Sequence, residues 1–132
     1  ESRGLGDVYK RQYKRFWDKY RFDIFDTSRQ STMYVKDIVL SWNRNNKDVL
    51  QRIYDDYFHK TFGSFCFLFN PNLKLNRKAR YARLKEITDI FMDDISCDGI
   101  EINHPIFKCM KKKNYRAIYV RIVLHIWKHK FD

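Results

Sequence analysis

The sequence predicts a mainly α-helical fold: a small bundle of four to five helices with one short β-hairpin near residues 95–102. In most of the chain, apolar side chains recur every three or four residues, which is the spacing of one face of a helix. One Asp-Gly pair stands between alternating residues, a pattern typical of a tight hairpin turn.

The first residues of the chain resemble something other than a protein family. The run from Ser2 to Gln12 is similar to the translated end of a transposon adapter used to prepare DNA sequencing libraries. We therefore treat residues 1–12 as a non-native, adapter-derived segment and residues 13–132 as a single basic helical domain. The alternative is a real basic arm. Because no Met begins the chain, we expect the domain to be a C-terminal fragment of a longer protein, translated from assembled, metagenomic-type DNA.

Helical periodicity predicts three helices in the first half of the chain. The first is expected over residues 13–25, where apolar and aromatic residues share one face. The second is expected to begin at Ser31 or Thr32, because either side chain can cap a helix N-terminus. The third, over residues 46–62, carries a broad apolar stripe, and Gly63 follows it where a left-handed C-terminal residue is expected.

The second half of the chain predicts two more helices and the hairpin. Residues 65–69 are apolar without helical spacing, which predicts a short buried strand or an apolar connector. Helices are predicted over residues 77–95 and 114–130, and the hairpin over residues 95–102 lies between them. A winged-helix arrangement is an alternative for these elements, with the helix over 77–95 as the recognition helix and the hairpin as the wing.

Charged residues are segregated along the chain. Residues 74–85 contain bases and no acids, residues 86–101 contain acids and no bases, and residues 108–130 are basic again. The helix predicted over 77–95 is therefore basic at its start and acidic at its end. The helix dipole favours the reverse by ~0.3–1 kcal/mol per well-placed charge. Local helix stability does not explain this pattern, so we expect a partner for the charges, inside or outside the molecule; a merely solvated face is the alternative.

The formal net charge of +11 favours a negatively charged partner. The leading hypothesis is a non-catalytic nucleic-acid-binding protein, or a basic helical subunit of a nucleoprotein complex, that contacts the phosphates of DNA or RNA without reading the base sequence. The alternative is a protein-interaction module that docks on an acidic partner or self-associates into an oligomer. The candidate contact residues are Lys74, Arg77, Lys78, Arg80, Arg83, Lys85, Lys111, Lys112, Lys113, Arg116 and Arg121.

A short stretch of the sequence suggests a second alternative function, that of an enzyme. Residues 22–27 (Phe-Asp-Ile-Phe-Asp-Thr) resemble motif I of the haloacid-dehalogenase-like phosphohydrolases. In that family the first Asp is the nucleophile and the Thr four residues later contacts phosphate, which implies these roles for Asp23 and Thr27. The pair Asp93-Asp94 resembles the family's acidic metal-binding motif. Phe25 stands where the family has its general acid, and an amphipathic helix over the same residues is the non-catalytic alternative.

No cofactor, metal ligand or catalytic residue is otherwise assigned. Outside residues 1–12 the glycines are Gly63 and Gly99, which excludes both a P-loop and a Rossmann fingerprint. Cys97, His104 and Cys109 lack the fourth ligand and the close spacing of a zinc site.

The cysteines and the hydropathy pattern bear on location. The three cysteines form no CxxC pair, which predicts free thiols in a reducing compartment and hence a cytoplasmic protein. No apolar run approaches the ~20 residues that a membrane-spanning helix needs, so we expect no membrane partner.

Overall fold

The computed structural model of the chain describes residues 24–42 and 47–131. The adapter-like residues 1–12 and almost all of the helix predicted over residues 13–25 lie outside this part. The described helices are α2 (Ile24–Trp42), α3 (Lys47–Phe67), α4 (Arg77–Ser96), α5 (Pro105–Lys111) and α6 (Tyr115–Phe131), and a 3-10 turn, η1 (Pro71–Leu73), joins α3 to α4.

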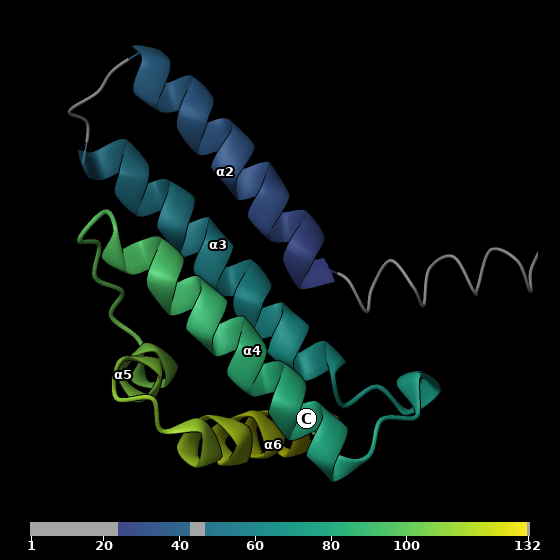
Figure 1. Ribbon diagram of the computed structural model, residues 1–132. Helices are drawn as coiled ribbons and strands as arrows, with labels where there is room; N and C mark the ends of the chain where they lie inside the picture. The colour runs from purple at the N-terminus through teal and green to yellow at the C-terminus, as the bar shows by residue number, and fades with distance from the viewer. Residues whose placement is uncertain (1–23, 43–46, 132) are drawn as a thin grey trace, which may run out of the picture.

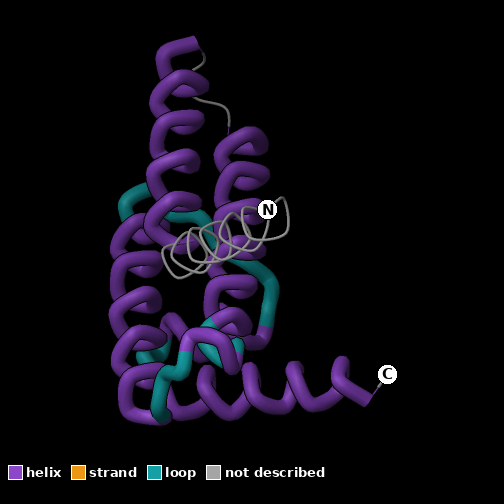
Figure 2. The backbone as a smooth tube through the Cα atoms, turned by 90° about the vertical axis from the view of Figure 1, so that its right-hand side faces the viewer, coloured by secondary structure: helices purple, strands orange, loops and turns teal. Residues whose placement is uncertain are grey.

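The long helices form a three-helix layer with a crossing helix at one end. Figure 1 shows α2, α3 and α4 side by side, with the chain running up, down and up again. Helix α6 lies across the lower end of this layer, and Figure 2 shows it extending sideways from the foot of the bundle. The start of α4 and all of α6 therefore meet at the same end of the molecule, although they are distant in sequence.

The core is built on aromatic contacts among α3, α4 and α5. The Phe91 ring of α4 packs edge-on against Tyr57 of α3, with ring centroids 4.8 Å apart, and lies 6.5 Å from Phe107 of α5. Such tilted arrangements are favoured because the positive edge of one ring meets the negative face of another. The buried apolar residues are Phe25, Tyr54, Tyr57, Phe58, Phe65, Leu68, Leu84, Ile87, Phe91, Ile95, Ile102, Ile106, Phe107, Met110, Ile118 and Ile122.

The prediction of a mainly helical bundle is confirmed, and helix α4 shows why. Its buried residues Leu84, Ile87, Phe91 and Ile95 recur at helical spacing, and α4 covers the predicted range 77–95 to within one residue. The Asn76 side chain caps the helix by accepting a 2.8 Å hydrogen bond from the Ala79 amide. The last helix likewise matches its predicted range.

The predicted β-hairpin over residues 95–102 is wrong. The described residues contain no strand: residues 95 and 96 still belong to α4, and residues 97–99 form a turn. Gly99 adopts a left-handed conformation with φ +64° just beyond the helix end, so the Asp-Gly pair ends a helix instead of joining two strands. Ile102 is buried in the core and draws the following segment inward. Without a hairpin there is no wing, so the winged-helix arrangement is wrong as well.

Helix boundaries in the first half of the described chain also differ from expectation. Thr32 lies inside α2, where its hydroxyl donates a 2.8 Å hydrogen bond to the Ser28 carbonyl instead of capping the helix. Gly63 lies inside α3, and residues 65–67 continue that helix where a strand or connector was expected. Phe65 is fully buried, so packing against the core extends the helix through the glycine.

Helix α5 was missing from the sequence-based prediction. Pro105 occupies its first turn, where the absent proline N–H would have no partner in any case, and His104 caps it by accepting a 3.1 Å hydrogen bond from the Ile106 amide. Phe107 and Met110 are buried beneath it. Proline can begin a helix as well as end one, so the His104-Pro105 pair marks the start of α5.

None of the helices that the structure describes is both long enough and apolar enough to cross a membrane.

Candidate nucleic-acid interface

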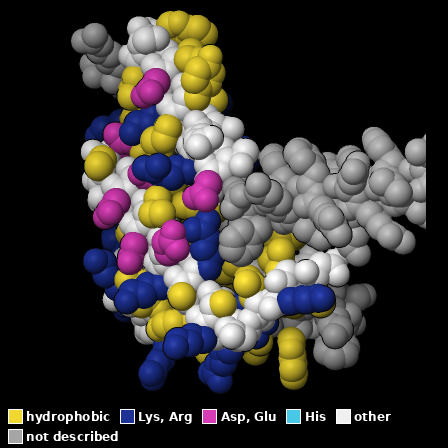
Figure 3. Space-filling model, turned by 45° about the vertical axis from the view of Figure 1, so that its right-hand side comes forward, with side chains coloured by type: hydrophobic (Ala, Val, Ile, Leu, Met, Phe, Trp, Pro, Cys, Tyr) yellow, Lys and Arg dark blue, Asp and Glu magenta, His cyan; other side chains and the backbone are white. Residues whose placement is uncertain are grey.

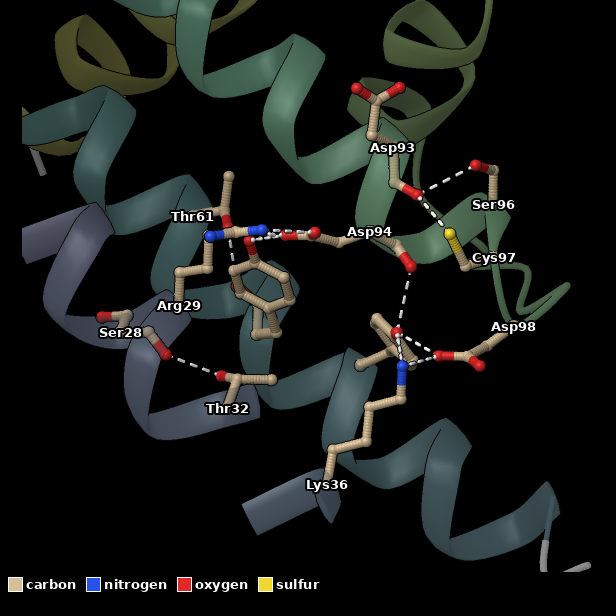
Figure 4. Close-up of polar contacts among 12 residues, drawn as sticks. Ser28, Arg29, Thr32, Lys36, Thr61, Asp93, Asp94, Ser96, Cys97 and Asp98 are labelled. Atoms are coloured by element: carbon tan, nitrogen blue, oxygen red, sulfur yellow. Dashed lines mark hydrogen bonds and ion pairs between the residues drawn. The ribbon is translucent and has the colours of Figure 1, made fainter. Parts of the chain in front are cut away.

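Two carboxylates near the acidic end of α4 form ion pairs with bases of α2. Asp94 accepts two hydrogen bonds from the Arg29 guanidinium of α2, from Nε at 2.7 Å and from Nη2 at 2.9 Å. One turn later, Asp98 forms an ion pair with Lys36, which also lies on α2. Figure 4 shows both bases reaching from α2 toward the end of α4, whereas the Asp93 carboxylate points away from them. These contacts fasten α2 to the bundle.

Two buried tyrosines of α3 complete this cluster. Tyr57 donates to Asp94 at 2.7 Å, and Tyr54 donates to Asp98. Burial, together with the hydrogen bond to Asp98, raises the pKa of Tyr54 to about 12, so this hydroxyl stays protonated and keeps donating. Burial disfavours the charged form of Asp98, but hydrogen bonds from Lys36 and Tyr54 outweigh it and hold the Asp98 pKa below its usual range. Asp94 near the end of α4 and Asp98 just beyond it are therefore satisfied within the fold.

Three of the predicted contact residues are also committed to partners within the molecule. Arg83 pairs with Asp26 at 3.1 Å and with Glu86 at 2.9 Å. Arg80 donates to the Tyr119 hydroxyl at 3.2 Å, and its guanidinium lies 5.0 Å from the centre of the Phe69 ring.

The third is Lys111, which forms an ion pair with Glu101. The contacts of Arg80, Arg83 and Lys111 hold helices and loops together, so we leave these residues out of the candidate interface.

The other predicted contact residues are exposed, and none of them forms an ion pair with another described residue. We call this set the cationic surface; its members are Lys74, Arg77, Lys78, Lys85, Lys112, Lys113, Arg116 and Arg121. Figure 3 shows Lys and Arg side chains projecting from the lower end of the molecule, whereas acids and bases alternate higher up. The cations at this end are thus accessible to an external anion.

The crossing of α4 and α6 brings the two basic stretches of the sequence together. The Lys85 ammonium of α4 lies 5.6 Å from the ring centre of Tyr115 at the start of α6. The Tyr115 hydroxyl donates to Asp89 of α4, and the Tyr81 and Tyr119 rings lie 6.3 Å apart. Because these contacts fix the crossing, cations from residues 74–85 and from residues 112–121 share one end of the bundle.

A groove between α5 and α6 extends the cationic surface. Its volume is about 470 Å³, and its lining includes Lys108, Lys112 and Arg121 but no carboxylate. The turn that forms its end closes with hydrogen bonds from the Lys113 amide to the Met110 carbonyl and from the Asn114 amide to the Cys109 carbonyl, both 3.0 Å. This is the hydrogen-bond pattern of a Schellman helix end. Lys108 begins the second basic stretch of the sequence but was not among the candidate residues named individually; it lies on α5, one turn before Lys112.

Two lysines of the cationic surface have an unfavourable backbone conformation. Lys74 has φ 52° and Lys113 has φ 54°, and they are the non-glycine residues with positive φ in the described part of the chain. A left-handed conformation costs a residue with a side chain roughly 1–2 kcal/mol, which glycine avoids. Lysine therefore stands at two positions where glycine would be more stable, and both positions carry exposed charge.

The described residues among those expected for an enzyme or a metal site form no common site. Asp23 lies outside the described residues, and Thr27 lies within helix α2. Asp94 is held by Arg29 and Tyr57, and Asp93 points away, so the pair does not form a shared ligand site. No set of three or more His, Cys, Asp or Glu side chains within the described ranges is arranged to hold a metal ion.

Comparison of the chain with protein-family models, with curated proteins and with solved structures gives no match.

Proposed function

We propose that this domain is a non-catalytic nucleic-acid-binding module, alone or as a basic helical subunit of a nucleoprotein complex, that contacts phosphates without reading the base sequence. One observation carries the proposal. Asp94 of α4, and Asp98 in the turn just beyond its end, have partners within the fold, whereas Arg77, Lys78 and Lys85 of α4 are exposed and form no ion pair with another described residue. Unpaired cations at the N-terminal half of a helix oppose its dipole, and an external polyanion compensates them.

The chemistry of the surface favours phosphate as the contacted group. Lysine ammonium groups act as mobile point charges, which suits the backbone of a nucleic acid more than the fixed pattern of base edges. The groove lined by Lys108, Lys112 and Arg121 adds cations beside those of α4, so several phosphates along one strand have a partner each. Binding of this kind releases counterions and weakens steeply as salt rises.

The test is the salt dependence of binding to a fluorescently labelled oligonucleotide. The double variant Lys112→Gln with Arg116→Gln removes two exposed charges from the cationic surface. The matched control, Lys47→Gln with Arg52→Gln, removes two exposed charges from the start of α3, at the opposite end of the bundle. Each lost phosphate contact lowers the slope of log K against log salt by about 0.7–0.9, so the first variant should lose about 1.4–1.8 and the control almost none.

The outcomes separate clearly. An unchanged slope in the double variant means that Lys112 and Arg116 do not contact phosphates, and an equal loss in the control means that net charge alone attracts the nucleic acid; either result contradicts the cationic surface as the interface. Binding no stronger than that of an equally basic control protein overturns the proposal altogether.

A second candidate function rests on a different feature of α6. Val120, Leu124 and Trp127 are 54%, 59% and 64% exposed and follow one another at helical spacing, so they form an apolar ridge beside the cations. Such a ridge favours docking on an acidic protein or self-association. Light scattering over a range of protein and salt concentrations tests self-association: a mass that stays monomeric throughout removes this version of the second candidate.

We also propose that the module works in the cytoplasm. Cys66, Cys97 and Cys109 are free thiols, and Cys97 is exposed. Unpaired thiols persist in a reducing compartment. The test is to purify the protein from the host cytoplasm and from the periplasm and to label each sample with a thiol reagent. We expect the cytoplasmic protein to be labelled fully and the periplasmic protein to have lost part of its free thiols.

A further inference from the structure

A groove at the foot of the bundle collects most of the histidines of the chain. It has a volume of about 490 Å³, within the ~300–1,000 Å³ range of small-molecule sites. We call it the histidine groove. Its lining includes Phe58, His59 and Phe62 of α3, His104 at the start of α5, and Arg121 and His125 of α6.

The rings of the histidine groove are packed against one another. Phe58 is 3% exposed and forms the floor, with its ring centre 5.0 Å from that of His104. Phe62 meets His125 edge-on, with ring centres 4.8 Å apart and planes at 88°, and lies 5.9 Å from His104. Rings held in this way present flat faces at a fixed place without a large loss of side-chain freedom on binding.

The charged residues that line the histidine groove are all basic. Arg121 and Lys128 line it, and neither forms an ion pair with another described residue. No carboxylate lines it; Asp55 and Glu101 lie in a separate depression beyond His59 and His104.

Two of the histidines remain neutral rings near neutral pH. Burial, and after it the positive charges of neighbouring residues, lowers the pKa of both His104 and His125. They therefore offer aromatic surface in a site whose fixed charge comes from Arg121 and Lys128.

The histidine groove also adjoins the groove between α5 and α6. The two share Arg121 and Pro105 in their linings, so Arg121 stands at their junction. An extended single-stranded nucleic acid that follows both grooves meets Lys112, Lys108, Arg121 and Lys128 in turn, so that each of these cations is placed to contact a phosphate. Aromatic faces combined with such a row of cations are the features with which proteins bind single-stranded nucleic acids.

We infer that the histidine groove receives an unstacked nucleobase of a single-stranded nucleic acid, whose adjoining phosphate contacts Arg121. The inference rests on the proposed function and narrows it to single strands. A base within a duplex is paired and stacked, so it reaches a recessed groove only after it is turned out of the helix, which weakens duplex binding. Stacking on a ring is available to every base, so the site does not require a particular sequence.

The experiment compares the full chain with single variants, using a single strand that carries a fluorescent adenine analogue and a duplex of the same sequence. His125→Gln removes a groove ring. His129→Gln removes the neighbouring ring, which packs 4.3 Å from that of His125 but does not line the groove, so it reveals any indirect effect. We expect the wild type to favour the single strand, His125→Gln to weaken single-strand binding about tenfold, and duplex binding to stay within a factor of two. The analogue should be quenched on binding to the wild type and to His129→Gln.

A second pair of variants keeps the test valid if His125→Gln disturbs the fold. Leu124→Glu places a negative charge on the wall of the histidine groove, and Val120→Glu places it one turn earlier on α6, outside the groove; both residues are exposed. We expect Leu124→Glu to weaken single-strand binding about tenfold more than Val120→Glu. Equal effects within each pair, together with equal affinity for single strand and duplex, overturn the groove site but leave the proposed function standing. No binding of either nucleic acid to the wild type overturns both.

Discussion

Replacing Asp94 by alanine is expected to lower the free energy of unfolding by about 3 kcal/mol, because it removes the group on which α2, α3 and α4 converge. The Asp94 side chain is 10% exposed and accepts hydrogen bonds from Arg29 at 2.7 and 2.9 Å and from Tyr57 at 2.7 Å. The two donors differ in burial: Tyr57 is fully buried, whereas the Arg29 side chain is 43% exposed.

The magnitude follows from that difference in burial. Without Asp94 the buried Tyr57 hydroxyl loses its acceptor and cannot regain water, a loss of about 1–3 kcal/mol. Arg29 regains water, so its share is that of a partly exposed ion pair, about 0.5–1 kcal/mol. Together these give about 1.5–4 kcal/mol, without any separate allowance for the pKa changes. The double variant with Tyr57→Phe should recover part of the loss, because the unsatisfied hydroxyl is then absent.

Urea unfolding followed by circular dichroism measures the change, provided that one transition is seen. Asp93→Ala is the matched control: Asp93 is adjacent in sequence and exposed, its carboxylate points away from the cluster, and the loss should stay within about 0.5 kcal/mol. If Asp94→Ala falls within 1 kcal/mol of Asp93→Ala, the cluster does not hold α2 in place and the account of the acidic half of α4 is wrong.

Three further predictions concern the turn, the histidines and the cysteines. Lys113→Gly should raise the free energy of unfolding by about 1 kcal/mol, because it relieves the left-handed conformation at φ 54°, and should weaken nucleic-acid binding; a loss of stability in urea would refute it. Burial and nearby positive charges depress the pKa of His104 and His125 below the ordinary 6.5, so the folded state binds fewer protons than the unfolded state and stability should fall as pH drops below about 6.5; urea midpoints that stay constant from about pH 8 to about pH 5.5 contradict this. Alkylation near neutral pH should modify exposed Cys97 before Cys66, whose thiol pKa is raised by burial; mass spectrometry of the digested protein gives the order.

Local patterns predicted the helices whose ends carry strong signals. Helix α4 has an asparagine cap and a regular apolar stripe, and the last helix has a stripe of similar regularity, so both were placed to within one or two residues. The prediction of the hairpin failed because an Asp-Gly pair is compatible with a helix end as well as with a tight turn. Which of the two forms depends on whether a second strand lies alongside the first. Residues 65–67 joined α3 because burial of Phe65 outweighs the glycine before it.

By itself, the sequence determined the helical class, the segregation of charge along the chain and the conflict between that charge and the dipole of α4. These are properties of neighbouring residues, and a helix repeats every three or four positions. Which cations remain free was decided only by the tertiary structure, because Arg29 and Asp94 meet across 65 positions and Arg83 meets Asp26 across 57. The histidine groove has the same origin: its rings come from α3, from the start of α5 and from α6, and only the packing of α6 across the foot of the bundle brings them together.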